Sequence, residues 1–169
     1  PAGDGITPGV QATLCRLLSH AAGSAGMAGG QAIDLASVGV ALDEAQLRHM
    51  HRLKTGALLQ GSVLMGAACG QADARALASL STYGATVGLA FQVVDDILDV
   101  IADSTTLGKT AGKDAATDKP TYVSLLGLAP AQAYAHQLLA EAHAALQSSG
   151  LEQQQALAAL ADMVVHRSH

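Results

Sequence analysis

Aromatic side chains are scarce in this sequence of 169 residues, which contains three Tyr, one Phe and no Trp. Half of the residues are nevertheless apolar, with Ala, Leu and Gly prominent among all residue types. Domains rich in β-strands rely on aromatic and β-branched residues, so this composition favours helices that pack closely through small side chains. The length is sufficient for one domain with its own core. We therefore expect residues 1–169 to form a single all-α domain.

Basic residues and long apolar runs are also lacking. The sequence has 9 Lys and Arg against 14 Asp and Glu, which gives a formal net charge of −5. No cluster of Lys and Arg offers the positive surface that nucleic acids require, so we expect no nucleic-acid partner. Gln, Asp or Ser interrupts each apolar run well before the roughly 18 residues that a membrane span needs. We therefore expect no transmembrane helix.

Cysteine is limited to Cys15 and Cys69, which form no CxxC motif. Both lie in apolar helical patterns, and this predicts two buried free thiols, as suits a reducing cytoplasm. The seven histidines do not have the spacing of metal ligands. His49 and His51, for example, are two residues apart and would lie on different faces of a helix. We expect a cytoplasmic protein whose histidines lie at the surface.

The sequence opens with PAGDGITPGV, which has no Met and no charged leader before an apolar run. This opening resembles a loop rather than a signal peptide, and we expect the natural chain to continue upstream. Thr7 and Pro8 predict a helix start. Apolar periodicity predicts helices and no strand, with a lysine-bearing loop at 104–121. The expected helices cover about 10–28, 33–36, 43–53 (ending near Gly56 or continuing to 68), 72–103, 121–128, 130–148 and 153–166.

An unusual acidic stripe lies in GLAFQVVDDILDV at positions 88–100. On a helix, offsets of three and four place Gln92, Asp95, Asp96, Asp99 and Asp103 on one face, while apolar residues cover the rest. Carboxylates this close repel one another, and the sequence supplies no Lys or Arg one turn away. A Mg²⁺ ion with oxygen ligands would supply the missing positive charge. The alternative is a solvated face of an amphipathic helix.

Two segments offer cations for a phosphate partner of that metal. Lys54 and Thr55 follow a helical run, and the loop at 104–121 carries Lys109, Lys113 and Lys119. The string LGKT in this loop is not a Walker A motif, because position 103 is Asp where that motif requires Gly. Lysines beside a metal-binding helix suit a diphosphate. A solvated lysine loop is the alternative.

Four segments together resemble the C-terminal part of the short-chain trans-isoprenyl diphosphate synthases, and most closely the bacterial farnesyl diphosphate synthases. They occur in the family's order: GMAGGQAIDL (26–35), HRLKTGALL (51–59), GLAFQVVDDILDV (88–100) and TLGKTAGKDAATDKPTYVSLLG (106–127). The resemblance implies an all-α bundle around a central cavity, of the isoprenoid synthase type, and a homodimer. It also implies a Mg²⁺-dependent transfer, with Mn²⁺ as a substitute, that joins isopentenyl diphosphate to an allylic diphosphate.

The resemblance assigns roles to individual residues. By this likeness Asp95, Asp96 and Asp99 form the second aspartate-rich motif, which holds the metal. Substrate contacts fall on a larger set, in which Lys54 and Lys109 also aid catalysis: Lys54, Thr55, Gln92, Lys109, Lys119 and Gln31. Asp34 belongs with Gln31 to the GQxxD segment that lines the same cavity, and Asp114 matches a metal position only weakly.

The sequence also departs from the family pattern. The first aspartate-rich motif, the Arg pair that follows it and the basic residues for isopentenyl diphosphate are absent from this chain. The N-terminal helices of the fold would be missing with them, so we expect residues 1–169 alone to be inactive. Two alternatives stay open: a non-catalytic subunit or fragment, and a helical bundle whose Asp stripe is only solvated.

Overall fold

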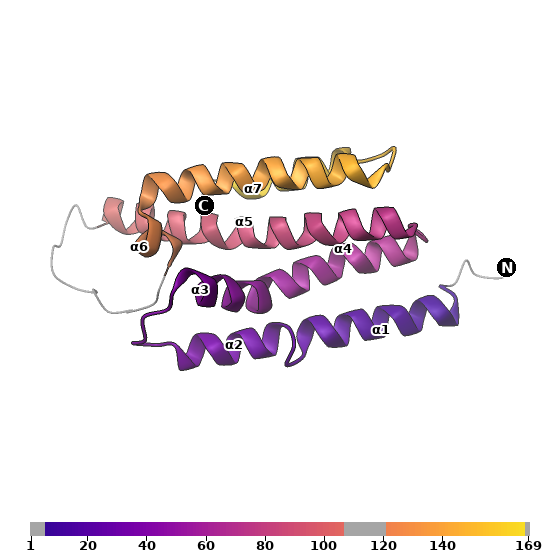
Figure 1. Ribbon diagram of the computed structural model, residues 1–169, viewed down its shortest axis with the longest axis horizontal. Coiled ribbons are helices and arrows are strands. Elements are labelled where there is room, and N and C mark those ends of the chain that lie inside the picture. Colours follow the sequence, from indigo (N-terminus) through magenta and orange to yellow (C-terminus); the bar gives the residue numbers. More distant parts are fainter. Residues whose placement is uncertain (1–5, 107–120, 168–169) are drawn as a thin grey trace.

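The computed structural model describes residues 6–106 and 121–167, with the backbone alone for 103–106, and all regular elements in these stretches are helices (Figure 1). This confirms the predicted all-α class. The elements are α1 (Pro8–Ala22), α2 (Met27–Ala36), α3 (Glu44–His51), the π-helical turn η1 (Arg52–Gly56), α4 (Ala57–Cys69), α5 (Ala74–Thr106), α6 (Tyr122–Leu126), α7 (Leu128–Ser149) and α8 (Gln155–His166).

Local sequence signals set several helix ends. The Thr7 hydroxyl accepts a hydrogen bond from the Val10 N–H at 3.3 Å, and Pro8 begins α1, as predicted. Asp43 caps α3 through a reciprocal pair of hydrogen bonds with Gln46. The segment after α3 does not stop at Gly56, because η1 joins α3 to α4 without a break. Likewise α5 continues to Thr106, so the predicted loop begins later than residue 104.

The helices lie in rows along one direction, with α5 at the centre (Figure 1). Helices α1 and α2 follow each other along one side and pack on α4 and η1 respectively. The run from α3 through η1 to α4 lies next, against α5. Helices α7 and α8 cover the opposite side of α5, and α6 closes one end of the α5–α7 pair. No helix in the two described stretches is long and apolar enough to cross a bilayer.

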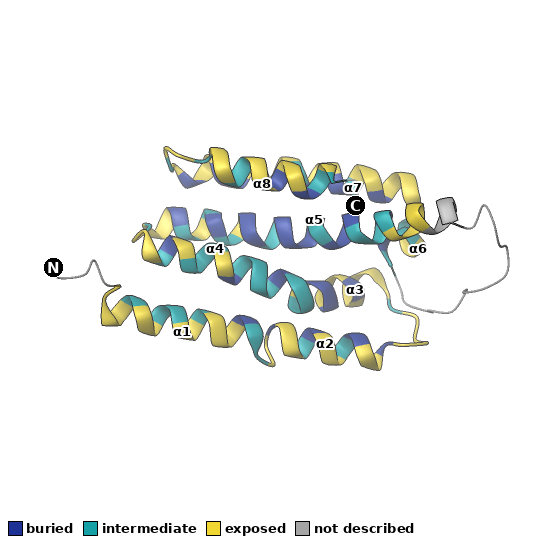
Figure 2. Cartoon of the chain, turned by 180° about the vertical axis from the view of Figure 1, so that it is seen from behind, coloured by how far each residue is buried: buried dark blue, intermediate teal, exposed yellow. Residues whose placement is uncertain are grey.

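The core follows α5, a helix of 33 residues. Buried positions concentrate on α5 and on the side of α7 that faces it (Figure 2). Tyr83 is fully buried, and its hydroxyl donates to the Leu157 carbonyl oxygen at 2.7 Å, which ties α5 to α8. Small residues let the helices approach, since Ala76, Ala90, Ala131, Ala135 and Ala142 are all buried.

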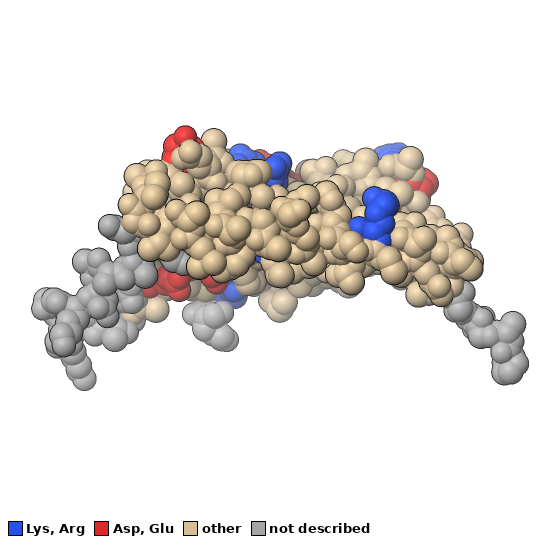
Figure 3. Space-filling view, turned by 90° about the horizontal axis from the view of Figure 1, so that it is seen from below, with Lys and Arg blue, Asp and Glu red and all other residues tan. Residues whose placement is uncertain are grey.

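The outer face of α1 and α2 contrasts with the core. Arg16 is the single Lys, Arg, Asp or Glu of α1, and Asp34, which is buried, is the single one of α2. Seen from that side, the surface is mostly uncharged (Figure 3). Leu18 and Leu35 are exposed there, with 50% and 65% of their surface accessible.

Two expectations about side-chain placement are wrong. Cys15 and Cys69 are free, as expected, but both are exposed rather than buried, because the apolar patterns around them are wider than the buried stripes of α1 and α4. His51 is buried, although the sequence placed the histidines at the surface. It faces the bundle because it lies at the end of α3, where α3, α5 and α6 meet.

Candidate active site

The acidic stripe lies on the C-terminal half of α5, near the end of the bundle where α3 and α6 pack. Three of its carboxylates, Asp95, Asp96 and Asp99, have different environments, and the Asp103 side chain lies outside the described residues. The Asp95 side chain is half exposed, at 49%, and Asp99 is exposed, whereas the Asp96 side chain is only 13% exposed. The helix therefore presents Asp95 and Asp99 to solvent and turns Asp96 inward.

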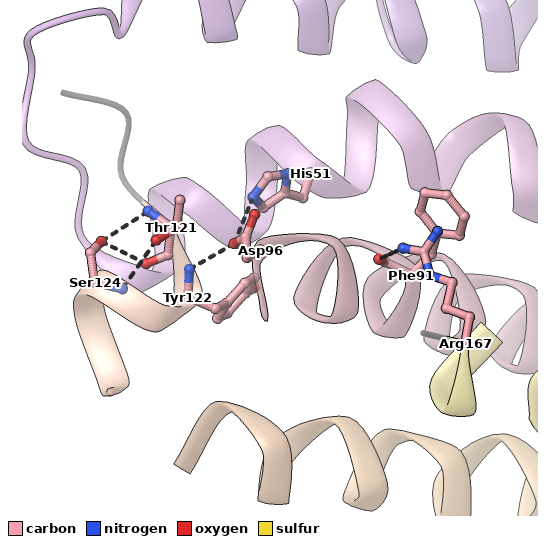
Figure 4. A network of polar contacts seen from close by, with 7 residues as sticks. All are labelled: His51, Phe91, Asp96, Thr121, Tyr122, Ser124 and Arg167. Atoms are coloured by element: carbon pink, nitrogen blue, oxygen red, sulfur yellow. Dashed lines mark hydrogen bonds and ion pairs between the residues drawn. The ribbon is translucent and has the colours of Figure 1, made fainter. Parts of the chain in front are cut away.

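Asp96 contacts α6 and α3. Its Oδ2 accepts a hydrogen bond from the Tyr122 N–H at 2.7 Å, and His51 Nε2 lies 4.0 Å from the same oxygen (Figure 4). Burial raises the pKa of the Asp96 carboxyl to about 6, although the Tyr122 N–H acts in the opposite direction. The neighbouring charges of Asp95 and Asp99 raise it further.

Asp95 has a cationic partner that the sequence analysis did not expect. Arg167, just after α8, donates from Nη2 to Asp95 Oδ1 at 3.0 Å and to the Phe91 carbonyl oxygen at 3.0 Å. Its guanidinium also lies over the Phe91 ring, 4.0 Å from the centroid (Figure 4). The prediction that no Lys or Arg lies one turn from the stripe along the helix is right, and Arg167 reaches Asp95 from a separate part of the chain.

Lys54 lies in η1, and its placement depends on α2. Its Nζ donates to Asp34 Oδ2 at 2.8 Å, and the Asp34 side chain is only 9% exposed. Helix α2 approaches the backbone of η1 closely at Gly30, where an added Cβ would lie 2.2 Å from Lys54 N. A π-helical turn inside a longer helical run is a frequent feature of functional sites. Here it contains both Lys54 and Thr55.

His51 connects the lysine side of the site to the acidic side. It lies one turn before Lys54, and its ring stacks on Tyr122 with centroids 5.9 Å apart. Burial lowers the pKa of the imidazole, and Lys54 acts in the same direction, whereas the Gln92 side chain, Asp34 and Asp95 oppose the shift. Both ring nitrogens lack a hydrogen-bond partner among the described residues. His51 Nε2 lies within 4.0 Å of Asp96 Oδ2, so the ring forms an ion pair with this carboxylate when it is protonated.

The other predicted site residues differ in how far they are buried, and some of them lie outside the described residues. Gln92 is buried in α5, Thr55 is half-buried in η1, and Gln31 is exposed on α2. Lys109, Lys113, Asp114 and Lys119 lie outside the described residues, and so do most positions of the predicted loop. The structure thus brings Lys54 and the carboxylates to one end of the bundle and leaves Gln31 at its outer surface.

The carboxylates of α5 fit a metal that is shared with a ligand, rather than one held by protein alone. Among the side chains of 6–102 and 121–167, no three His, Cys, Asp or Glu gather as a cage for an ion. Mg²⁺ typically keeps several waters and binds one or two carboxylates together with substrate phosphates. Asp95 and Asp99 are one turn apart and accessible, which suits that mode.

Sequence reasoning missed His51, Tyr122 and Arg167. A signal for His51 exists, since it lies three residues before Lys54 and so shares a helical face with it. Tyr122 begins α6, the first described helix after the predicted lysine loop, which is a weaker signal. Arg167 had none, because it is 72 residues from Asp95 in the sequence.

Comparison with known proteins agrees with this geometry. The Polyprenyl synthetase family model matches residues 9–161. The chain is 44% identical over 154 residues to farnesyl diphosphate synthase from Escherichia coli, covering 89% of this chain and 52% of that enzyme. A structure of an FPP/GFPP synthase from Zymomonas mobilis superposes with a TM-score of 0.79 at 34% identity, covering 94% of this chain and 52% of that one.

A second solved structure carries ligands: geranyltransferase from Helicobacter pylori complexed with magnesium and isoprenyl diphosphate. It superposes with a TM-score of 0.73 at 32% identity, covering 97% of this chain and 53% of that one. The chain thus spans about half the length of these relatives. The likeness confirms the resemblance seen in the sequence and the isoprenoid synthase fold. From its helices, its motifs and these matches, the chain belongs to the polyprenyl synthetase family.

Proposed function

We propose that the protein to which this chain belongs is a Mg²⁺-dependent prenyltransferase. It condenses isopentenyl diphosphate with an allylic diphosphate to give farnesyl diphosphate or a related short-chain product. One observation carries the proposal: η1 and α5 pack together, so that Lys54 and the half-exposed carboxylate of Asp95 are both within electrostatic reach of the same His51 ring, with Asp99 one turn further along α5. A cation beside carboxylates at one end of an apolar helical bundle suits a metal-bridged diphosphate.

The chemistry needs negative charge to be neutralised on the departing diphosphate. Lys54 supplies an ammonium group that the buried Asp34 carboxylate orients at 2.8 Å. Mg²⁺, when bound, supplies charge neutralisation without proton transfer. The apolar sides of α4 and α5 would keep water from an allylic cation. Lys109 and Lys119 remain proposed contacts to the diphosphate, together with Thr55, Gln92 and Gln31.

The test is ligand-induced thermal stabilisation of this chain by Mg²⁺ with inorganic diphosphate. At a hundred times the dissociation constant, binding stabilises the native state by about 2.7 kcal/mol. For a chain of this size that raises the Tm by about 5–10 °C. Asp95→Asn and Lys54→Gln should each abolish most of the shift. Asp162→Asn is the matched control, since the Asp162 side chain is as exposed as that of Asp95 but pairs with His143, away from the site.

Prenyl transfer itself is measured with isopentenyl diphosphate and geranyl diphosphate. We expect residues 1–169 alone to show no turnover, because the first aspartate-rich motif is not in this sequence. Stabilisation by Mg²⁺ and diphosphate without turnover supports the proposed role of the chain as half of a synthase site. Absence of any stabilisation would contradict the proposal. Assembly as a homodimer remains a prediction, which light scattering coupled to size exclusion would test.

A further inference from the structure

The middle carboxylate of the stripe differs from its neighbours in geometry. Asp95 and Asp99 are four residues apart and lie on one stripe of α5, whereas Asp96 is turned from Asp95 by about 100° around the helix. That rotation directs Asp96 towards α6 and α3, where its side chain is 13% exposed against 49% for Asp95. Asp96 is thus the one carboxylate of the three that the fold encloses.

One oxygen of the Asp96 carboxylate already accepts a hydrogen bond from the backbone. Asp96 Oδ2 accepts the Tyr122 N–H at 2.7 Å, across 26 residues of sequence (Figure 4). Tyr122 is the first residue of α6, so its N–H has no acceptor within that helix. The carboxylate therefore satisfies a backbone donor that would otherwise be buried and unpaired, because Tyr122 itself is fully buried.

The His51 ring also lies beside that oxygen and belongs to a series of ring contacts. The His51 ring stacks on Tyr122 at an interplanar angle of 25°, and its Nε2 lies 4.0 Å from Asp96 Oδ2. The rings of Tyr122 and Tyr134 are also in contact, with centroids 5.8 Å apart. A Mg²⁺ ion that keeps several waters needs open space beside its ligand oxygen. Among the described residues, the Asp95 and Asp99 side chains have more of that space than Asp96, whose side chain is only 13% exposed and whose Oδ2 already accepts a hydrogen bond.

We propose that Asp96 is a positioning residue of this motif and not a metal ligand: through Tyr122 N–H it fixes α6 and the His51–Tyr122 stack against α5, and it leaves the metal to Asp95 and Asp99. The part of this inference that concerns the metal rests on the proposed function. The part that concerns the anchor rests on the contacts of Asp96 alone.

Two substitutions at Asp96 separate the roles. Asp96→Asn keeps an oxygen acceptor for the Tyr122 N–H but removes the negative charge, whereas Asp96→Ala removes both. In amide hydrogen exchange of this chain, Asp96→Ala should accelerate exchange at Tyr122 by about tenfold or more, while Asp96→Asn should stay within about threefold of the unchanged chain. Thermal melts without ligand should follow the same order, with Asp96→Ala the least stable.

The metal is tested by titrating Mg²⁺ at fixed inorganic diphosphate and following the Tm. Asp95→Asn should raise the midpoint by at least about tenfold, as loss of a metal-site partner generally does. Asp96→Asn should leave the midpoint within about threefold of that of the unchanged chain. A midpoint raised as far by Asp96→Asn as by Asp95→Asn would overturn the assignment. So would unchanged Tyr122 exchange in Asp96→Ala.

These results are distinguishable from failure of the proposed function. If the unchanged chain gave no response to Mg²⁺ and diphosphate, the prenyltransferase proposal and the metal part of this inference would both fail. The exchange and melting data on Asp96→Asn and Asp96→Ala would still decide whether Asp96 anchors α6.

Discussion

Replacing Gly30 by Ala tests whether close approach of α2 to η1 places Lys54. A Cβ on Gly30 would lie 2.2 Å from Lys54 N and 2.5 Å from Lys54 Cα, where ordinary contact begins at 3.4 Å. Both atoms belong to the backbone, so no side-chain rotation can relieve the overlap. One helical segment must move away by about 1 Å, at a cost near the upper end of the 1–3 kcal/mol typical of overpacking.

The helix propensity of Ala offsets about 1 kcal/mol of that cost. We therefore expect Gly30→Ala to lower the stability by about 2 kcal/mol and the Tm by about 4–8 °C. The same movement should lengthen the 2.8 Å contact between Lys54 Nζ and Asp34 Oδ2 beyond hydrogen-bond range. The stabilisation of the remaining folded protein by Mg²⁺ and diphosphate should then weaken as well.

The assay is a thermal melt with and without these ligands, and Gly66→Ala is its matched control. Gly66 lies in α4, and an added Cβ there meets nothing within 4 Å. Gly66→Ala should therefore raise stability by about 0.5–1 kcal/mol. If Gly30→Ala were stabilised to the same extent, the close approach of α2 to η1 would not determine the position of Lys54.

The remaining predictions concern the contacts of Tyr83 and Arg167 and the exposure of the two cysteines. Tyr83→Phe removes the hydrogen bond to the Leu157 carbonyl, which keeps its acceptor role within α8, and should cost about 0.5–1.5 kcal/mol in denaturant unfolding at neutral pH. Burial raises the pKa of Tyr83 from 10.0 to about 12, so its protonated form favours folding, and stability should fall from pH 10 to 12 more steeply in the unchanged chain than in Tyr83→Phe. Arg167→Ala should lower the Tm by about 4–8 °C, because it removes the hydrogen bond to the Phe91 carbonyl and the contact with the Phe91 ring as well as the Asp95 pairing, and it should lower the Mg²⁺ midpoint by freeing a carboxylate oxygen. Both cysteines should react with a thiol reagent in the native state; protection of either would contradict their exposure.

Helix positions were largely predictable because their causes are local. The capping residues Thr7 and Asp43 act within three residues, and the apolar period of α5 is visible over any few turns. The acidic stripe and its shared face were visible for the same reason. The family motifs, which are also short and contiguous, predicted the isoprenoid synthase fold that the solved relatives share.

Side-chain burial was less predictable where several faces of a helix are apolar. Cys15 and Cys69 lie in helices that have more apolar residues than the neighbouring helices cover. Periodicity alone could not predict which of these apolar residues are exposed. His51 shows the reverse error, since a polar residue was assigned to the surface although three helices meet over it.

The sequence by itself determined the helices, the row of carboxylates on α5 and the family to which the chain belongs, because each depends on residues within a few turns of one another. Only the tertiary structure decided which partners those groups meet. Lys54 pairs with Asp34 across 20 residues, Asp96 with Tyr122 across 26, and Asp95 with Arg167 across 72. These distances along the chain are closed by packing of separate helices, and no periodicity within one helix specifies which side chains will meet.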